Sequence, residues 1–172
     1  MAMKHFVQQN LQYYGYIIFT SLDVEGAFDA AWWPSILNSL RQMECPKNLY
    51  YLAREYLKDR RATICINEYK SVKAVEKGCP QGSTCGPGFW NILYNSMLNI
   101  NFTHRTEVIA FADDLLILTK GSSALEAENY ANQDIKKIEL WAKDNKIKFN
   151  DTKSNIMLVS RKKNSQNEII NI

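Results

Sequence analysis

Two adjacent aspartates inside an apolar run are the first feature of this sequence that could do chemistry. Asp113 and Asp114 interrupt the stretch Ala-Phe-Ala-Asp-Asp-Leu-Leu-Ile-Leu, residues 110–118. An apolar stretch of this length should be buried, and burying an unpaired carboxylate costs several kcal/mol. A bound cation would compensate for both charges. The alternative is an Asp-Asp turn that joins two strands and leaves both acids in water, and this stretch alone leaves the two readings equally open.

Two strand elements must position these acids. Because strand side chains alternate between faces, neighbouring aspartates suit the tip of a hairpin formed by residues 108–112 and 115–119. Residues 16–24, Tyr-Ile-Ile-Phe-Thr-Ser-Leu-Asp-Val, are rich in β-branched and aromatic side chains. This composition predicts a buried strand whose last residues include Asp23. If the two strands take adjacent central places in one sheet, Asp23 and the hairpin tip lie at the same edge.

Three carboxylates at one sheet edge suit divalent cations. Mg²⁺ takes oxygen ligands and needs only one or two protein carboxylates besides waters and the phosphates of a substrate. Two such ions about 3.5 to 4 Å apart stabilise the attacking and leaving oxygens of an in-line phosphoryl transfer. We expect Asp23 and Asp113 to bridge the ions and Asp114, pointing the other way in a regular strand, to be a more peripheral ligand. The alternative for Asp23 is an ordinary strand-terminal acid before a turn.

The remaining elements predict an α+β fold. Pro34 and Pro46 each open a helix, residues 62–67 and 70–76 form a second hairpin, and residues 89–100 are helical. Strands and helices in this order predict a mainly antiparallel sheet with helices packed on one face. Residues 1–14 carry too little pattern for a prediction.

A long helix follows the central hairpin. Its start carries a capping box of Ser123 and Glu126. Short strands near residues 147–150 and 154–160 come after it, and a polar tail closes the chain. The apolar residues that recur at helical spacing predict the buried stripe of this helix: Leu125, Ala131, Ile135, Ile138 and Trp141.

Length and composition bound the class of protein. The 172 residues suit one domain, and 21 basic against 18 acidic residues give a net charge of +3, too small by itself to indicate a nucleic-acid partner. The four cysteines form no C-x-x-C pair, which argues against a structural zinc site and for reduced, mostly buried thiols. Because neither a signal-peptide core nor an uncharged apolar run of about 18 residues is present, we expect an intracellular protein without a membrane partner.

Four stretches resemble, in order, successive motifs of the reverse transcriptases. Phe-Ala-Asp-Asp and the Glu-Gly-Ala-Phe-Asp that precedes two tryptophans are most similar to the enzymes of non-LTR (LINE-like) retrotransposons. The resemblance runs from about residue 16 to residue 160 and implies a polymerase palm there, between an N-terminal segment (1–15) and a polar basic tail (161–172). The four stretches are Leu-Asp-Val-Glu-Gly-Ala-Phe-Asp (22–29), Gly-Cys-Pro-Gln-Gly-Ser (78–83), Phe-Ala-Asp-Asp (111–114) and Asn-Asp-Thr-Lys (150–153).

The resemblance implies roles for residues at the acidic edge. Asp23, Asp113 and Asp114 match the catalytic ligands of two Mg²⁺ ions, for which Mn²⁺ could substitute. The backbone carbonyl of Val24 matches a further ligand to the metal that carries the triphosphate. Lys153 matches a lysine proposed to protonate the pyrophosphate leaving group, and its alternative is a solvated surface residue.

The resemblance also implies a nucleotide site. Phe28 matches the aromatic steric gate that favours deoxynucleotides, and its alternative is an apolar core residue. The loop with Pro80, Gln81 and Gly82 matches the segment beside the template base and the incoming nucleotide. Its glycines allow the backbone to approach a ligand closely, and the alternative is a surface loop that caps a helix.

The function implied is RNA-directed DNA polymerisation from an RNA template, a DNA primer and dNTPs, with the enzyme nuclear when it acts. Fingers before the first motif and a thumb after the last are required in this family, yet only 22 residues precede Asp23 and 19 follow Lys153. We therefore expect fingers and thumb regions in a longer polyprotein, and weak or no activity of the isolated chain. Two alternatives remain: a non-catalytic palm-fold module that binds RNA or a protein, and another two-metal enzyme such as a nucleotide cyclase.

Overall fold

The chain folds into two compact units. The computed structural model describes residues 2–80 and 82–161. The first unit comprises the described chain up to Glu25, the segment Leu98–Asp144 and the described chain from Lys148 onward, and the second comprises Gly26–Met97 and Asn145–Ile147. The basic residues Lys162 and Lys163 of the predicted tail lie outside the described residues, as does Gln81. Among the described residues, no helix is both long and apolar enough to span a bilayer.

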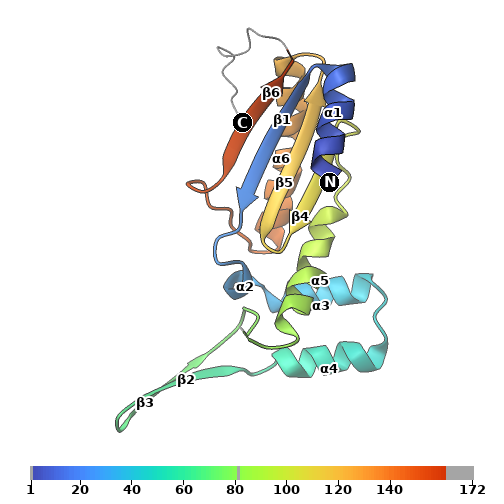
Figure 1. Ribbon diagram of the computed structural model, residues 1–172. Helices are drawn as coiled ribbons and strands as arrows, with labels where there is room; N and C mark the ends of the chain where they lie inside the picture. Colours follow the sequence, from blue (N-terminus) through green and yellow to red (C-terminus); the bar gives the residue numbers. More distant parts are fainter. Residues whose placement is uncertain (1, 81, 162–172) are drawn as a thin grey trace. The chain divides into compact units, whose positions relative to one another are not determined.

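An antiparallel sheet forms the first unit, with strand order β4-β5-β1-β6 (Figure 1). The strand predicted over residues 16–24 is the second of the two central strands, and its first five residues are buried. It pairs with the second strand of the predicted hairpin on one side and with the last strand of the chain on the other. The strands are β1 (Tyr16–Asp23), β4 (Thr106–Phe111), β5 (Asp114–Gly121) and β6 (Asn155–Ser160).

Helices cover both faces of this sheet. Helix α6 (Ala124–Asp144) packs on one face, and α1 (Ala2–Tyr14) packs on the other. The predicted α+β class with an antiparallel sheet is confirmed, but the prediction that helices pack on one face only is incomplete. Both sets of alternating side chains in β1 are apolar, so both faces need cover. Phe6 of α1 supplies part of it by packing with Ile17 and Phe19 of β1.

The predicted capping box of α6 forms in part: Ser123 caps the helix, but the reciprocal hydrogen bond comes from Ser122 instead of Ser123. Glu126 N–H donates to Ser123 Oγ at 3.1 Å, and the Glu126 carboxylate accepts the Ser122 N–H at 2.6 Å. Hydrogen bonds from Ser122 hold the pKa of Glu126 below its ordinary value. The predicted stripe is correct for Ala131, Ile138 and Trp141, which are buried, while Ile135 is half-buried.

Leu125 is wrong as a member of that stripe, because 66% of its side chain is exposed. Ala127 is the first buried residue of α6. At 3.6 residues per turn, a residue two positions earlier points to the opposite side of a helix.

The last two predicted strands are only half correct. Residues 155–160 form β6, but residues 147–150 contribute a single bridge, from Phe149 to Val24. The two segments do not pair with each other: β6 pairs with β1, and Phe149 pairs with Val24, the residue that follows β1. The chain between them turns at residues 150–154 and continues along the same neighbour.

The second unit contains four helices and a hairpin. The helices predicted from Pro34 and Pro46 are confirmed, and the turn of the hairpin falls at Asn67, where φ is 52°. All twelve hairpin residues are exposed, and the hairpin extends from the rest of its unit in Figure 1. The elements are α2 (Ala27–Ala30), α3 (Trp33–Gln42), α4 (Lys47–Leu57), β2 (Arg61–Ile66), β3 (Tyr69–Ala74) and α5 (Gly86–Leu98), whose last residue belongs to the first unit.

Candidate active site

Asp23 and Asp114 face each other across two neighbouring strands. The register of β1 and β5 pairs them directly. The Asp23 carbonyl accepts Asn150 N–H at 2.8 Å and its N–H donates to Ser154 Oγ at 3.4 Å, so both backbone groups are turned away from β5. The two aspartates therefore form a non-hydrogen-bonded pair, in which Cα atoms lie about 4.5 Å apart and side chains approach most closely. Like charges at such a pair repel each other.

Asp113 occupies the turn of the β4–β5 hairpin. The turn consists of Ala112, where φ is 55°, and Asp113, and it closes on the pair Phe111 and Asp114. We expected Asp114 to point away from Asp23, and the register contradicts this. Because Asp113 is a turn residue rather than a strand residue, regular alternation begins only at Asp114, which falls on the face of Asp23. All three acids still lie at one end of the sheet.

The Val24 carbonyl is oriented toward the β5 side of the sheet. Val24 and Phe149 form a bridge in which the hydrogen bonds are made by their neighbours: Glu25 N–H donates to Lys148 O, and Asn150 N–H donates to Asp23 O. At such a pair the N–H and C=O groups of the paired residue point away from the partner strand. In the described part of the chain, no hydrogen bond to this carbonyl is recorded. The oxygen is available as a ligand next to the acids.

Lys153 lies beside Asp23. Its Nζ is 3.7 Å from Asp23 Oδ2, and the lysine side chain is 68% exposed whereas that of Asp23 is 25% exposed. A turn presents the lysine: the side chain of Asn150 accepts both the N–H and the hydroxyl of Thr152, at 3.1 and 2.7 Å. One exposed lysine offsets part of the charge of three carboxylates.

Two positioning residues were missed by the sequence analysis. Asn150 forms the turn just described, and Ser154 Oγ donates to the Asn150 carbonyl at 2.8 Å while accepting the Asp23 N–H. Asn followed two residues later by Thr is a recognised turn signal, so the role of Asn150 could have been found. The role of Ser154 depends on the tertiary pairing.

The donor set at this edge fits magnesium in its chemistry. Carboxylate oxygens and a backbone carbonyl are the hard ligands that Mg²⁺ takes, and they leave coordination positions for waters and phosphates. Among the described residues, no group of three or more acids, cysteines or histidines lies close enough together to hold a metal ion by itself. At this edge the directly paired Asp23 and Asp114 could hold a cation only together with further ligands, such as waters or the phosphates of a substrate.

Phe28 and the loop from Gly78 come together in the second unit. Cys79 N–H donates to the Phe28 carbonyl, and Gly78 N–H donates to the Ala31 carbonyl, each at 2.7 Å. Phe28 is half-buried, and its ring lies 5.8 Å from that of Trp90. Gly78 has a φ of 98°, and a Cβ there would lie 3.3 Å from the backbone oxygen of Asp29, so the close approach requires glycine.

The rest of the loop is more open. Pro80 is half-buried and its carbonyl accepts the Ser83 N–H at 3.1 Å, while Gly82 is exposed with a φ of 77°. Gln81 lies outside the described residues. The structure thus joins the Phe28 segment to the loop and joins the acids to Lys153, each set within its own unit.

Comparisons with known proteins identify the family. The family model for reverse transcriptase (RNA-dependent DNA polymerase) matches residues 2–169. The RNA-directed DNA polymerase from mobile element jockey of Drosophila melanogaster is 29% identical over 155 residues, 85% of this chain and 17% of that protein. The putative 115 kDa protein in type-1 retrotransposable element R1DM, from the same organism, is 32% identical over 84% of this chain and 14% of its own length. The chain thus spans less than a fifth of the length of these relatives.

The fold agrees with this assignment. The structure of telomerase from Candida tropicalis in complex with a TWJ fragment of telomeric RNA has a TM-score of 0.71 over 91% of this chain and 28% of that chain, at 14% identity. The apo telomerase of the same organism has a TM-score of 0.70. These similarities support the predicted polymerase palm fold. The chain belongs to the reverse transcriptase family, and its relatives are the RNA-directed DNA polymerases of non-LTR retrotransposons.

Proposed function

We propose that this chain supplies the catalytic palm for RNA-directed DNA synthesis, by two-metal transfer of a nucleotide from a dNTP to a primer 3′-hydroxyl. The observation that carries the proposal is the direct pairing of Asp23 with Asp114 at the end of the sheet where Asp113 forms the turn. Acids facing each other at this spacing destabilise the sheet unless a cation lies between them. Divalent ions bound for the reaction would offset the repulsion between these paired acids.

The chain's own residues would hold two Mg²⁺ ions, or Mn²⁺ in their place. Asp23 and Asp113 would serve as bridging ligands, Asp114 as the further carboxylate, and the Val24 carbonyl as a backbone ligand. When bound, the ions would stabilise charge on the attacking and leaving oxygens. Lys153, held near Asp23 by its turn, would supply positive charge or a proton at the pyrophosphate side.

The second unit would recognise the nucleotide. Phe28 would act as the steric gate against a 2′-hydroxyl, and its contact with Trp90 together with the Cys79 hydrogen bond to its carbonyl limits its freedom to move. Pro80, Gln81 and Gly82 would lie against the template base and the nucleotide. Gly78 allows that loop to approach the Phe28 segment closely.

The partners follow from the family. The jockey relative is named as an RNA-directed DNA polymerase, and one telomerase structure is a complex with a fragment of telomeric RNA. We therefore propose an RNA template, a DNA primer and dNTPs as substrates. In a longer polyprotein, fingers and thumb regions would accompany the palm, and the complete enzyme would act in the nucleus.

Primer extension tests the proposal. The full chain, an RNA template annealed to a DNA primer, Mg²⁺ or Mn²⁺ and one labelled dNTP are combined, and addition of the first nucleotide is measured. We expect slow incorporation that requires the complementary template base and the metal and that is lost in Asp113→Asn. Incorporation that survives this substitution would refute the role of the acids. If no nucleotide is added with either Mg²⁺ or Mn²⁺ while the chain still binds RNA, the result would favour the non-catalytic module.

A further inference from the structure

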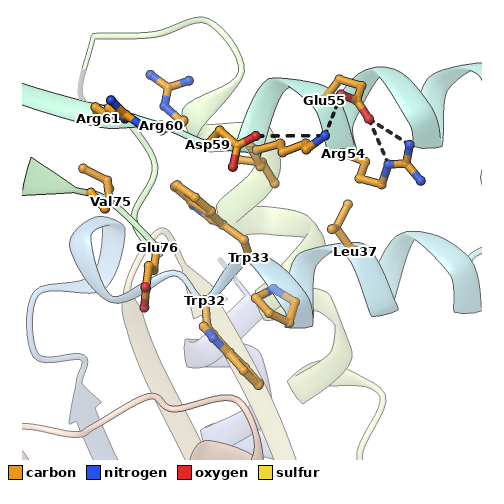
Figure 2. Close-up of a pocket in the computed structure, with 14 residues that line it drawn as sticks. Trp32, Trp33, Leu37, Arg54, Glu55, Asp59, Arg60, Arg61, Val75 and Glu76 are labelled. Atoms are coloured by element: carbon orange, nitrogen blue, oxygen red, sulfur yellow. Dashed lines mark hydrogen bonds and ion pairs between the residues drawn. The ribbon is translucent and has the colours of Figure 1, made fainter.

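A groove in the second unit has no role in the function proposed above. It encloses about 860 Å³ between the start of α3, the end of α4 and the base of the β2–β3 hairpin. Figure 2 shows Trp32 and Trp33 with Leu37 on one side and Arg60, Arg61 and Val75 on the other. Trp33 is buried and donates its indole N–H to the Gly78 carbonyl at 2.8 Å, so this side chain is a fixed wall of the groove.

A second hollow of about 730 Å³ adjoins the groove. The two share Trp32 and the residues at the end of β3 and just after it, Ala74, Val75 and Glu76. Trp32 is half-buried, and the Lys146 ammonium lies 4.0 Å from the centre of its ring. Trp32 therefore presents a partly accessible aromatic ring between two hollows.

The charge around Trp32 is positive and largely uncompensated. At the end of α4, Arg54 pairs with Glu55, and Lys58 pairs with Glu55 and Asp59, so these two cations and two acids neutralise each other. Two other acids, Asp29 and Glu76, line the hollows. Against them stand five cations for which no ion pair is recorded among the described residues: Arg60, Arg61, Lys73, Lys77 and Lys146.

We propose that the Trp32 groove binds single-stranded nucleic acid. An aromatic ring with cations in the hollows on both sides that have no carboxylate partner in the described part of the chain matches a base between its two phosphates, the combination that single-strand binders use. The arginines lie in one hollow, the lysines 73, 77 and 146 lie in the other, and Trp32 lies where the two meet. The site shares no residue with the set Asp23, Asp113 and Asp114 and needs no metal. An acidic polypeptide could satisfy the cations but has no need of the partly accessible indole ring of Trp32.

Fluorescence anisotropy of the full chain in EDTA tests this site. The probes are labelled oligo(U) and oligo(dT) of about twelve residues, a length within the range of known single-strand sites. We expect Trp32→Ala to weaken binding about 5- to 100-fold and Trp32→Phe to retain most of it, since stacking on one ring carries that much. Arg61→Ala and Lys73→Ala should each make the plot of log K against log salt concentration less steep, by about 1 in the magnitude of its negative slope. EDTA makes the outcome independent of the metal-dependent reaction proposed above.

Three controls make the result decisive. An oligonucleotide with abasic residues should bind wild type as weakly as oligo(U) binds Trp32→Ala. Combining the abasic probe with the Trp32→Ala variant should cause no further loss of affinity. Tyr13→Ala and Lys136→Ala, which remove an exposed aromatic and an exposed cation from the first unit, should leave binding unchanged. Equal binding of the abasic and normal probes by wild type would overturn the proposal. So would displacement of oligo(U) by polyglutamate at equal charge, which would indicate an acidic protein partner.

Discussion

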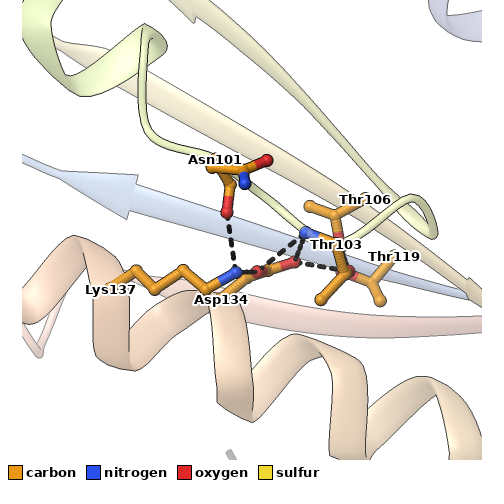
Figure 3. A network of polar contacts seen from close by, with 6 residues as sticks. All are labelled: Asn101, Thr103, Thr106, Thr119, Asp134 and Lys137. Atoms are coloured by element: carbon orange, nitrogen blue, oxygen red, sulfur yellow. Dashed lines mark hydrogen bonds and ion pairs between the residues drawn. The ribbon is translucent and has the colours of Figure 1, made fainter.

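Asp134 holds the hairpin that carries two of the acids against α6 (Figure 3). Its fully buried carboxylate accepts the Thr103 N–H at 3.1 Å, the Thr103 hydroxyl at 2.7 Å and the Lys137 ammonium at 2.8 Å. Hydroxyl contacts continue from Thr103 to Thr106 in β4 at 3.2 Å and from Thr106 to Thr119 in β5 at 3.1 Å. We predict that Asp134→Ala strongly destabilises the first unit.

The structure sets the size of that effect. Removing the carboxylate leaves the N–H and hydroxyl of Thr103 without their acceptor, and a stranded buried donor costs about 1 to 3 kcal/mol. Lys137 is 39% exposed and can turn to water, so its loss adds little. We expect Asp134→Ala to lower the free energy of unfolding by about 2 to 4 kcal/mol. Asp134→Asn keeps one acceptor oxygen and should lose about half as much.

Thermal unfolding followed by circular dichroism measures the effect. For a chain of this size, about 2 to 4 kcal/mol corresponds to a Tm about 5 to 10 °C lower. Lys136→Ala, an exposed neighbour on the same helix, is the matched control and should change little. A Tm for Asp134→Ala within about 1 °C of wild type would refute the assigned role.

The pH dependence gives an independent check. Burial alone would raise the pKa of Asp134, but the hydrogen bonds from Lys137 and Thr103 outweigh it and hold the pKa below its ordinary value. A depressed pKa in the folded state contributes stability above the unfolded value of about 4, and this contribution is lost as pH falls through the folded value. The difference in stability between wild type and Asp134→Asn should therefore stay constant near neutral pH and shrink below about pH 4.

Three further predictions follow from single contacts. In EDTA, the free energy of unfolding measured in urea should be about 0.5 to 1 kcal/mol higher for Asp114→Asn than for wild type, because the substitution relieves repulsion from Asp23. Added Mg²⁺ should stabilise wild type but not the variant. Equal stability of the two proteins in EDTA and in Mg²⁺ would contradict this. Gly121→Ala puts a Cβ 2.5 Å from the Ala127 backbone nitrogen and should cost about 2 to 3 kcal/mol in urea unfolding, whereas Gly88→Ala meets open space and should not. Burial raises the pKa of Cys79 to about 11, so iodoacetamide at mildly alkaline pH should modify exposed cysteines first, and early labelling of Cys79 by mass spectrometry would refute its burial.

Local patterns predicted the elements well. The strand that ends at Asp23, the hairpin around the paired aspartates and the helix cap at Ser123 depend on residues close in sequence, and each formed. The positions of prolines predicted the starts of α3 and α4 for the same reason.

Features that depend on tertiary contacts could not be predicted from the sequence. Whether Asp113 is a strand residue or a turn residue shifts the alternation by one position, and such a shift moves Asp114 to the other face of the sheet. Asp134 falls on the apolar face of α6, where a carboxylate can be buried only because Thr103, 31 residues away in sequence, donates a hydrogen bond to it. The helix α1 was missed because only three apolar residues, Phe6, Val7 and Leu11, mark its packed face.

Iron-mediated cleavage tests the central claim, that the acids at the end of the sheet form one divalent-cation site. With added ascorbate and hydrogen peroxide, Fe²⁺ bound in place of Mg²⁺ reduces the peroxide to hydroxyl radicals that cut the backbone next to the metal, and mass spectrometry locates the cuts. We predict paired cuts near Asp23 and near Asp113, both suppressed by excess Mg²⁺ and both lost in Asp113→Asn. Cuts at only one of these segments, or paired cuts that persist in the variant, would contradict a shared site.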